Sequence, residues 1–189
     1  MPIVSIEGNI ASGKTTHLKL LESAGYTVHY DDSHEQSDLA SKYYNDMKRY
    51  SLGYHLRLLR NFSLHAHTST DAVHIYENSP YTLKHVHCEL LHEKRCFDED
   101  EYKIYDEYNT QHGWMPDVMI YLYCHPSVCH DRLMPAGQVK SDHILDLHAK
   151  YEIACDDLNI TDHVKLYKIN SQEDIDTVYR SIIDIIKTL

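Results

Sequence analysis

A glycine-framed segment near the N-terminus constrains the fold of this 189-residue chain more than any other feature. The pattern G-x-x-x-x-G-K-T, typical of phosphate-binding loops, is formed by Gly8, Gly13, Lys14 and Thr15. An apolar run precedes the pattern, and an amphipathic run from His17 to Ser23 follows it, which indicates a strand, a turn and a helix. Such a helix N-terminus offers backbone N–H groups and the positive end of the helix dipole to an anion. The segment therefore predicts a nucleotide-phosphate site.

Each residue type in this loop has an expected role. Glycine allows the backbone to approach a phosphate closely. The Lys14 amine is expected to reach the β- and γ-phosphates of ATP, and the Thr15 hydroxyl is expected to bind Mg²⁺. The residues expected to contact ATP are Gly8, Asn9, Ile10, Ala11, Ser12, Gly13, Lys14, Thr15 and Thr16.

Five short apolar runs separated by helical patterns predict an α/β fold. The expected strands are Ile3–Glu7, Thr27–Tyr30, Val73–Glu77, Val118–Tyr123 and Val164–Ile169. Strands that alternate with helices favour a parallel sheet with helices on both faces. With no repeat or linker-like run, residues 1–189 are expected to form one domain. Ligands of such sheets bind beyond the carboxyl ends of the strands.

Helical periodicity is clearest in four segments. One or two helices are expected over Leu39–Leu59, and others over Ser127–Met134, around Ile144 to Tyr151, and over Ile175–Ile186. A polar connector, Ala136–Ser141, lies between the second and third of these.

Composition narrows the function classes. The net charge of −11 and the pI near 5.7 argue against a general nucleic-acid binder, which needs a basic face. Five cysteines without a C-x-x-C pair, and a first strand that starts at once, predict reduced thiols, no targeting segment and a cytoplasmic location. No apolar run predicts a membrane span. The chain has 16 Tyr and 2 Phe, so tyrosine is the expected core aromatic.

Acidic residues follow two of the expected strands. Asp31 and Asp32 follow the second strand, and Glu77 ends the third, where it is expected to hold Mg²⁺ through water. A solvated turn at Asp31-Asp32 and an ordinary polar strand end at Glu77 are the alternative interpretations. The segment Asn170–Asp174, after the fifth strand, is a candidate border for the adenine. By analogy, small chains with these parts are mostly nucleoside or nucleotide kinases.

The loop sequence from Gly8 to Thr15, preceded by Ile6-Glu7, closely resembles that of the deoxynucleoside kinases. This family comprises the deoxycytidine, deoxyguanosine and mitochondrial thymidine kinases, the insect multisubstrate kinase and, more distantly, the herpesvirus thymidine kinases. The resemblance implies ATP- and Mg²⁺-dependent transfer of the γ-phosphate to the 5′-hydroxyl of a deoxynucleoside. It also implies a P-loop kinase fold, a short lid at about residues 132–142, and a homodimer.

The resemblance continues weakly along the chain and assigns roles to single residues. Asp31 takes the place of the glutamate that accepts the 5′-hydroxyl proton, and Asp32 that of the following proline. Tyr44 matches the tyrosine at the sugar 3′-hydroxyl, and Tyr54-His55 matches a Phe-Gln pair beside the base. Implied catalytic residues are Asp31, Lys14 and Arg132, and implied lid contacts to ATP are Arg132 and Lys140. Implied nucleoside contacts are Asp31, Tyr44, Tyr54, His55, Phe62, Leu83, Glu77 and Asp142.

Departures from the family pattern bear on the substrate. Asn78 replaces an arginine, and Arg57 or Arg95 are candidates to supply the missing charge. An arginine and an aspartate surround the base in deoxycytidine-type members, whereas Phe62 and Leu83 stand at those positions here. This favours thymidine or another pyrimidine deoxynucleoside.

Other functions remain open from the sequence. A thymidylate-type monophosphate kinase shares the fold and the loop, although the segment Asp31–Asp38 is acidic. A non-catalytic nucleotide-binding homologue would explain the loss of the arginine at position 78. A metal-binding protein is suggested by His65 and His67 together with His85, His87, Cys88, His92 and Cys96.

Overall fold

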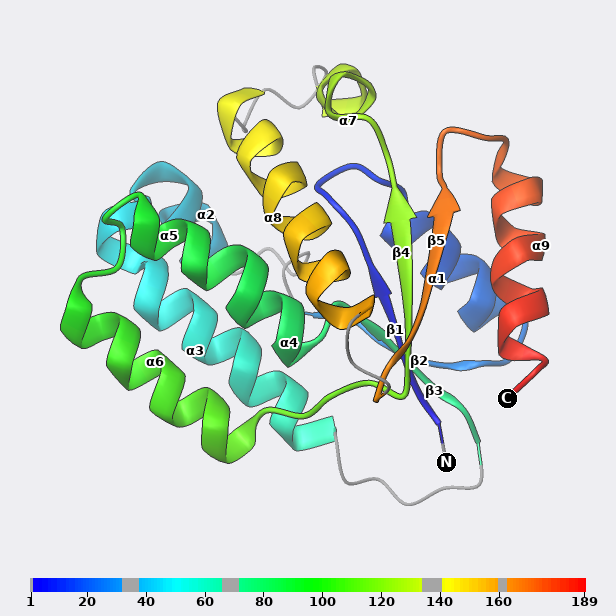
Figure 1. Cartoon of the computed structure of the whole chain (residues 1–189), viewed down its shortest axis with the longest axis horizontal. Helices are drawn as coiled ribbons and strands as arrows, with labels where there is room; N and C mark the ends of the chain where they lie inside the picture. The colour runs from blue at the N-terminus through cyan, green and yellow to red at the C-terminus, as the bar shows by residue number, and fades with distance from the viewer. Residues whose placement is uncertain (1, 32–37, 66–71, 134–140, 160–162) are drawn as a thin grey trace.

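The computed structural model describes residues 2–31, 38–65, 72–133, 141–159 and 163–189. Five parallel strands form one sheet in the order β2-β3-β1-β4-β5, which confirms the predicted fold class (Figure 1). The strands are β1 Ile3–Glu7, β2 Thr27–His29, β3 His74–Glu77, β4 Val118–Tyr123 and β5 Lys165–Asn170.

Three strands have boundaries that differ by one residue from the prediction, because the ladder of paired residues sets the ends. The pairing of β2 with β3 runs from Thr27 opposite His74 to His29 opposite Tyr76. The pairing of β5 with β4 runs on to Asn170, which lies opposite Tyr123. The central strand β1 is paired on both sides and is apolar for most of its length, as expected for a strand covered on both faces.

Helices α1, Lys14–Ser23, and α9, Ile175–Ile186, cover one face of the sheet (Figure 1). In α9 the apolar residues Val178, Ile182 and Ile186 recur every four residues and are buried against the strands. The helix begins where predicted, because the Asp174 carboxylate accepts a hydrogen bond of 2.9 Å from the Thr177 N–H.

The other helices lie on the opposite face or follow the carboxyl ends of the strands. The predicted helical segment Leu39–Leu59 is two helices that extend further on both sides, broken at Asp46. The helix predicted over Ser127–Met134 starts one residue earlier, because proline suits a first helical position, and is described to Leu133. The helices outside the α1 and α9 layer are α2 Asp38–Asn45, α3 Met47–His65, α4 Pro80–Thr82, the π-helical stretch η1 Leu83–Cys88, α5 Glu89–Glu93, α6 Glu99–His112, α7 Pro126–Leu133 and α8 Ser141–Asn159.

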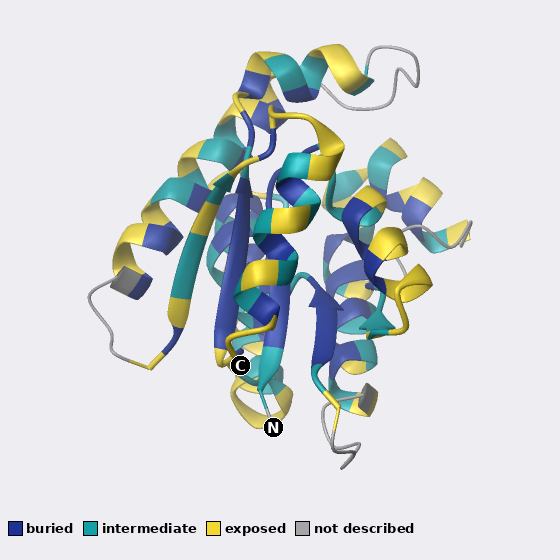
Figure 2. Ribbon diagram, turned by 90° about the vertical axis from the view of Figure 1, so that its right-hand side faces the viewer, coloured by how far each residue is buried: buried dark blue, intermediate teal, exposed yellow. Residues whose placement is uncertain are grey.

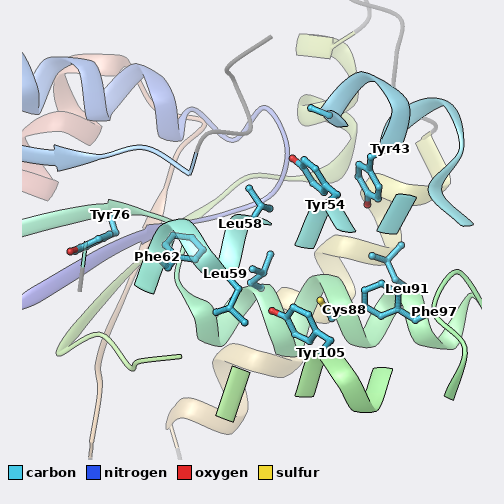
Figure 3. Packing of buried hydrophobic residues seen from close by; sticks show 12 residues of the cluster. Tyr43, Tyr54, Leu58, Leu59, Phe62, Tyr76, Cys88, Leu91, Phe97 and Tyr105 are labelled. Carbon is cyan, nitrogen blue, oxygen red and sulfur yellow. The ribbon is translucent and has the colours of Figure 1, made fainter. Parts of the chain in front are cut away.

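Tyrosine is the main aromatic of the core, as predicted. Figure 3 shows Tyr43, Tyr54, Tyr76 and Tyr105 packed among leucines and both phenylalanines of the chain. On the α8 side, Tyr121 stacks on Tyr151 at 5.4 Å, and its hydroxyl donates to Glu152 at 3.1 Å. The hydroxyl of a buried tyrosine needs such a partner.

Figure 2 shows the central strands as the most deeply buried part of the molecule, whereas the edge strand β5 is partly exposed. Among the described helices, none combines the length and the apolar character needed to cross a bilayer.

The packing of α9 yields a stability prediction. Ile182→Ala removes a side chain that is 0% exposed and should lower the free energy of unfolding by about 2–5 kcal/mol, measured by chemical denaturation. Ile153→Ala, at a helical position 56% exposed, is the matched control and should change it by less than about 1 kcal/mol. Equal losses in the two variants would contradict the described packing.

Candidate active site

A cavity of about 580 Å³ opens at the carboxyl edge of the sheet. Residues at the ends of β1, β2, β3 and β5 line it, because parallel strands end at the same edge, and α7 adds Arg132 and Leu133. From the glycine-framed loop, the lining residues are Gly8, Ile10, Ala11, Ser12, Gly13, Lys14, Thr15 and Thr16. The loop is thus the wall of a cavity large enough for a small ligand.

The turn of this loop depends on two glycines. Gly8 has φ 149°, and a Cβ there would lie 2.8 Å from the Leu122 carbonyl oxygen of the neighbouring strand. Gly13, with φ 101°, precedes the first residue of α1. Side chains rarely occupy either conformation, so both positions require glycine.

The Lys14 amine lies over the loop. It donates to the Gly8 carbonyl at 2.7 Å and to the Asn9 carbonyl at 3.2 Å. The cation is therefore held at the mouth of the turn, where an anion bound at the start of α1 would meet it.

The side chain of Asn9 supports the loop from behind. Its side chain is 1% exposed, and the amide nitrogen donates to the Ile144 carbonyl at 2.8 Å, while its oxygen accepts from the Ile10 N–H. These bonds hold the side chain away from the cavity and join the loop to α8. Asn9 acts as a support of the loop, and its side chain is not among the described groups that line the cavity.

The two residues predicted to bind Mg²⁺ are in contact. The Thr15 hydroxyl lies 2.9 Å from a Glu77 carboxylate oxygen, and both residues line the cavity next to Lys14. Glu77 is at the end of β3, beside the loop after β1. Hydroxyl and carboxylate oxygens are the donors that a hard divalent cation prefers, so the pair fits Mg²⁺.

Asp31 lines the same cavity two residues beyond the end of β2. The Asn78 amide donates to the Asp31 carboxylate at 2.6 Å. Asn78 has φ 61°, a conformation that asparagine tolerates better than most side chains. Asn78 itself therefore takes the position of the arginine expected beside Asp31.

The two arginines considered as substitutes lie elsewhere. Arg95 is exposed in the turn after α5, and neither it nor Arg57 is among the described residues that line the cavity. Asp32 is outside the described residues.

Tyr44 and Tyr54, predicted to contact the nucleoside, both line the cavity near Asp31. Burial raises the pKa of each hydroxyl, and the Asp31 carboxylate adds to the shift. Both hydroxyls stay protonated at neutral pH and can donate hydrogen bonds. They suit the hydroxyl groups of a sugar.

The cavity contains a mainly apolar part formed by α3 and η1. It is lined by His55, Phe62 and Leu83, which are expected to contact the nucleoside, and each is at most 4% exposed. His87 and His143 line the cavity too, although the sequence interpretation did not place them there. Burial lowers the pKa of both, so they are neutral at pH 7.

Arg132, the predicted lid arginine, bridges three parts of the site. Its guanidinium donates to the Ala11 carbonyl at 3.2 Å, the Ser171 carbonyl at 3.1 Å and the Cys124 sulfur at 3.7 Å. Most of the predicted lid, residues 134–140 with Lys140 among them, lies outside the described part of the chain.

Asp142, which is expected to contact the nucleoside, is not among the described residues that line the cavity. Asp142 is exposed in the first turn of α8, whereas the next two residues, His143 and Ile144, face inward. A helix turns about 100° per residue, so adjacent positions face different directions. Ser171 and Glu173, from the candidate border of the adenine, and Ile175, the first residue of α9, also line the cavity.

The clustered histidines and cysteines do not form a metal site among the described residues, of which His67 is not one. Residues two positions apart on a helix face different ways, which separates His85 from His87. All five cysteines are described and carry free thiols.

Comparison with known proteins identifies the family. The sequence model described as "Deoxynucleoside kinase" matches residues 4–189. The chain belongs to the deoxynucleoside kinase family. Among relatives of this deoxynucleoside kinase, the probable deoxycytidine kinase of fowlpox virus is 30% identical over 169 residues, covering 79% of this chain and 69% of the viral protein.

Other relatives extend the comparison. A putative kinase of invertebrate iridescent virus 3 is 28% identical, and the match covers 85% of this chain and 87% of the viral protein. The chicken deoxycytidine kinase 2 is 25% identical, and the match covers 79% of this chain and 72% of the chicken protein. Among solved structures, deoxyadenosine kinase from M. mycoides with bound dCTP superposes with a TM-score of 0.83 at 16% identity, covering 99% of this chain and 100% of that one. The superposition supports the shared fold.

Gly8→Ala should damage this deoxynucleoside kinase through the backbone alone. The added methyl meets the Leu122 carbonyl at 2.8 Å, so the free energy of unfolding and the affinity for ATP should both fall, the former by at least about 1 kcal/mol. Gly53→Ala, where a Cβ meets nothing within 4 Å, should instead raise stability by up to about 1 kcal/mol. Denaturant unfolding and ATP titration measure both effects, and a neutral Gly8→Ala would contradict the described turn.

Glu7 gives a prediction about pH. Burial raises the pKa of this carboxyl to about 7, an effect that hydrogen bonds from the hydroxyls of Ser79 and Thr82 partly offset. The folded protein then binds more protons than the unfolded chain between about pH 4.5 and 7, so Glu7 makes stability fall as the pH rises through this range.

Glu7→Gln removes the titrating carboxyl, and with it the fall in stability that Glu7 causes as the pH rises. The variant should gain stability relative to the wild type between pH 5 and pH 8, by an amount on the order of 2 kcal/mol, measured by denaturant unfolding. Glu107→Gln, at an exposed position of α6, is the control and should show no such gain. If the difference in unfolding free energy between Glu7→Gln and the wild type did not change with pH, the raised pKa of the Glu7 carboxyl would be refuted.

Proposed function

We propose that this kinase transfers the γ-phosphate of ATP to the 5′-hydroxyl of a pyrimidine deoxynucleoside, with thymidine preferred. The observation that carries the proposal is a single cavity lined by the phosphate-loop residues Lys14 and Thr15 and by the carboxylate of Asp31. A triphosphate at the loop and a sugar hydroxyl beside Asp31 would share this space. Residues 1–189 act as one kinase domain in this proposal.

Phosphoryl transfer requires positioning and charge neutralisation more than covalent chemistry. Lys14 and the start of α1 hold the phosphates in the proposed reaction, and Arg132 neutralises charge from the side of α7. Thr15 and Glu77 would hold Mg²⁺, which would further neutralise charge on the phosphate oxygens. Asp31 accepts the 5′-hydroxyl proton as that oxygen bonds to phosphorus.

Asn78 supports this role of Asp31. Its amide holds one carboxylate oxygen at 2.6 Å and fixes the carboxylate in the cavity without adding a positive charge. The Tyr44 and Tyr54 hydroxyls, which remain protonated, are suited to bind the sugar beside it. The shorter aspartate is thus held in place by neighbouring polar groups.

The apolar residues Phe62 and Leu83 support the choice of thymidine. Both are buried at the cavity wall, where they would contact the 5-methyl group of thymine. A methyl contact is worth only about 1 kcal/mol, so deoxycytidine, the substrate in the names of the fowlpox and chicken relatives, is the competing base.

A monophosphate kinase is the second candidate among functions. A nucleoside monophosphate would need cationic groups near Asp31. Of the described residues that line the cavity, the lysine and arginine are Lys14 and Arg132, both in contact with the phosphate loop. This distribution favours an uncharged nucleoside as the acceptor.

The test is a panel of radiolabelled nucleosides and nucleoside monophosphates incubated with ATP and Mg²⁺. Thymidine should be converted to its 5′-monophosphate, and the monophosphates should remain unchanged. Transfer to monophosphates alone would replace the proposal with the second candidate, and no transfer to any acceptor would overturn both.

Asp31→Asn should lower kcat by about 10²–10⁴-fold while changing the nucleoside dissociation constant little, because the variant loses the proton acceptor and keeps the shape. Steady-state kinetics and equilibrium binding measure the two effects. Asp184→Asn, on the exposed face of α9, is the matched control and should keep wild-type turnover. Unchanged turnover in Asp31→Asn would remove Asp31 from the mechanism.

A further inference from the structure

Thr82, in the short helix α4, is buried and makes contacts in two directions. Its hydroxyl donates a hydrogen bond of 2.7 Å to a carboxyl oxygen of Glu7. Glu7 is the last residue of β1, directly before Gly8, and is itself 0% exposed. Thr82 therefore contacts the base of the phosphate loop from the side of α4.

The same hydroxyl also fixes the turn that precedes α4. Its oxygen accepts a hydrogen bond of 3.4 Å from the Ser79 N–H, and the Ser79 hydroxyl accepts one of 3.4 Å from the Thr82 N–H. This reciprocal pair is a capping box, which satisfies two backbone donors at the start of a helix. Because Ser79 directly follows Asn78, the box holds the peptide group on the carboxyl side of Asn78.

The peptide group on the amino side of Asn78 is held as well. The Asn78 N–H donates to the Ile6 carbonyl of β1 at 3.1 Å. Asn78 has φ 61°, and such a conformation persists where the surrounding structure holds the residue on both sides. In this position its amide donates to the Asp31 carboxylate at 2.6 Å. The place of Asp31 therefore depends on the bonds that hold the backbone at Asn78.

Thr82 lies behind the cavity wall. Asn78 and Asp31 are among the described residues that line the cavity, and Thr82 is not. A change at Thr82 can thus affect the reaction only through the groups that it holds in place. In a transfer between two bound molecules, a misplacement of about 1 Å can cost about 10²-fold in rate. The contacts of Thr82 therefore bear on turnover more than on binding.

We propose that Thr82 is a positioning residue for phosphate transfer, because its hydroxyl ties the base of the phosphate loop to the asparagine that orients Asp31. The loop is reached through Glu7, and Asp31 is reached through Ser79 and Asn78. The proposal rests on the proposed function, in which Asp31 accepts the 5′-hydroxyl proton. It makes one buried hydroxyl set the distance between the phosphate donor and the proton acceptor.

The test measures kcat and the equilibrium dissociation constants of the purified 189-residue chain for ATP and for thymidine, or for deoxycytidine if that is the better substrate. Thr82→Val keeps the shape of the side chain without the hydroxyl. Its kcat should fall by about 10–10²-fold, while both dissociation constants change by less than about threefold. Thr82→Ser keeps the hydroxyl and should restore kcat to within about threefold of the wild type. Thr110→Val, exposed on α6, is the matched control and should keep wild-type kcat.

A double variant distinguishes positioning of Asp31 from a general loss of structure. If Thr82 acts through Asp31, adding Thr82→Val to Asp31→Asn should lower kcat by less than about threefold further, because the group that it positions is already gone. Two losses that multiply would show that Thr82 does not act through Asp31, and the proposal would be overturned.

Thermal unfolding shows whether each variant is folded. Ser79→Ala removes the other hydroxyl of the capping box and should lower kcat by about threefold or more, so it answers the question if Thr82→Val does not fold. Wild-type kcat in a folded variant that lacks either hydroxyl, or no recovery in Thr82→Ser, would overturn the positioning role and leave the proposed function intact. A wild-type protein that phosphorylates neither nucleoside would instead refute the proposed function.

Discussion

The close approach of Gly8 to the Leu122 carbonyl is the constraint on which the rest of the site depends. With 2.8 Å between that oxygen and any added Cβ, the chain leaves β1 in a direction open only to glycine. The turn that follows brings Lys14 back over Gly8 and Asn9 and starts α1. The Asn9 side chain then ties the turn to α8, so the loop is supported from both sides.

The parallel sheet arranges the charges of the cavity along one direction. The cations Lys14 and Arg132 both contact the phosphate loop. Near Asp31 the partner is a neutral amide, and the histidines on α3, η1 and α8 are uncharged because burial lowers their pKa. Such a gradient suits a ligand pair with a highly charged end and a neutral end, as ATP and a nucleoside would be.

Sequence reasoning succeeded where local chemistry determines position. The glycine loop, the contact of Thr15 with Glu77 and the place of Asp31 all follow from residues at the ends of parallel strands. It did not anticipate positions that depend on how a helix is rotated about its axis. Asp142 and His143 are neighbours, yet one is exposed and the other lines the cavity. His87 and the hydrogen bond between Asn78 and Asp31 likewise depend on tertiary packing that single residues do not encode.

The central claim is that phosphate donor and nucleoside lie end to end in one cavity. A crystal structure with a bisubstrate analogue, in which adenosine and thymidine are joined through a polyphosphate chain, tests it most directly. The account predicts phosphates against the loop from Gly8 to Thr15 and the thymidine 5′-oxygen within hydrogen-bond distance of Asp31. A thymidine moiety bound away from Asp31, or phosphates bound away from the loop, would contradict it.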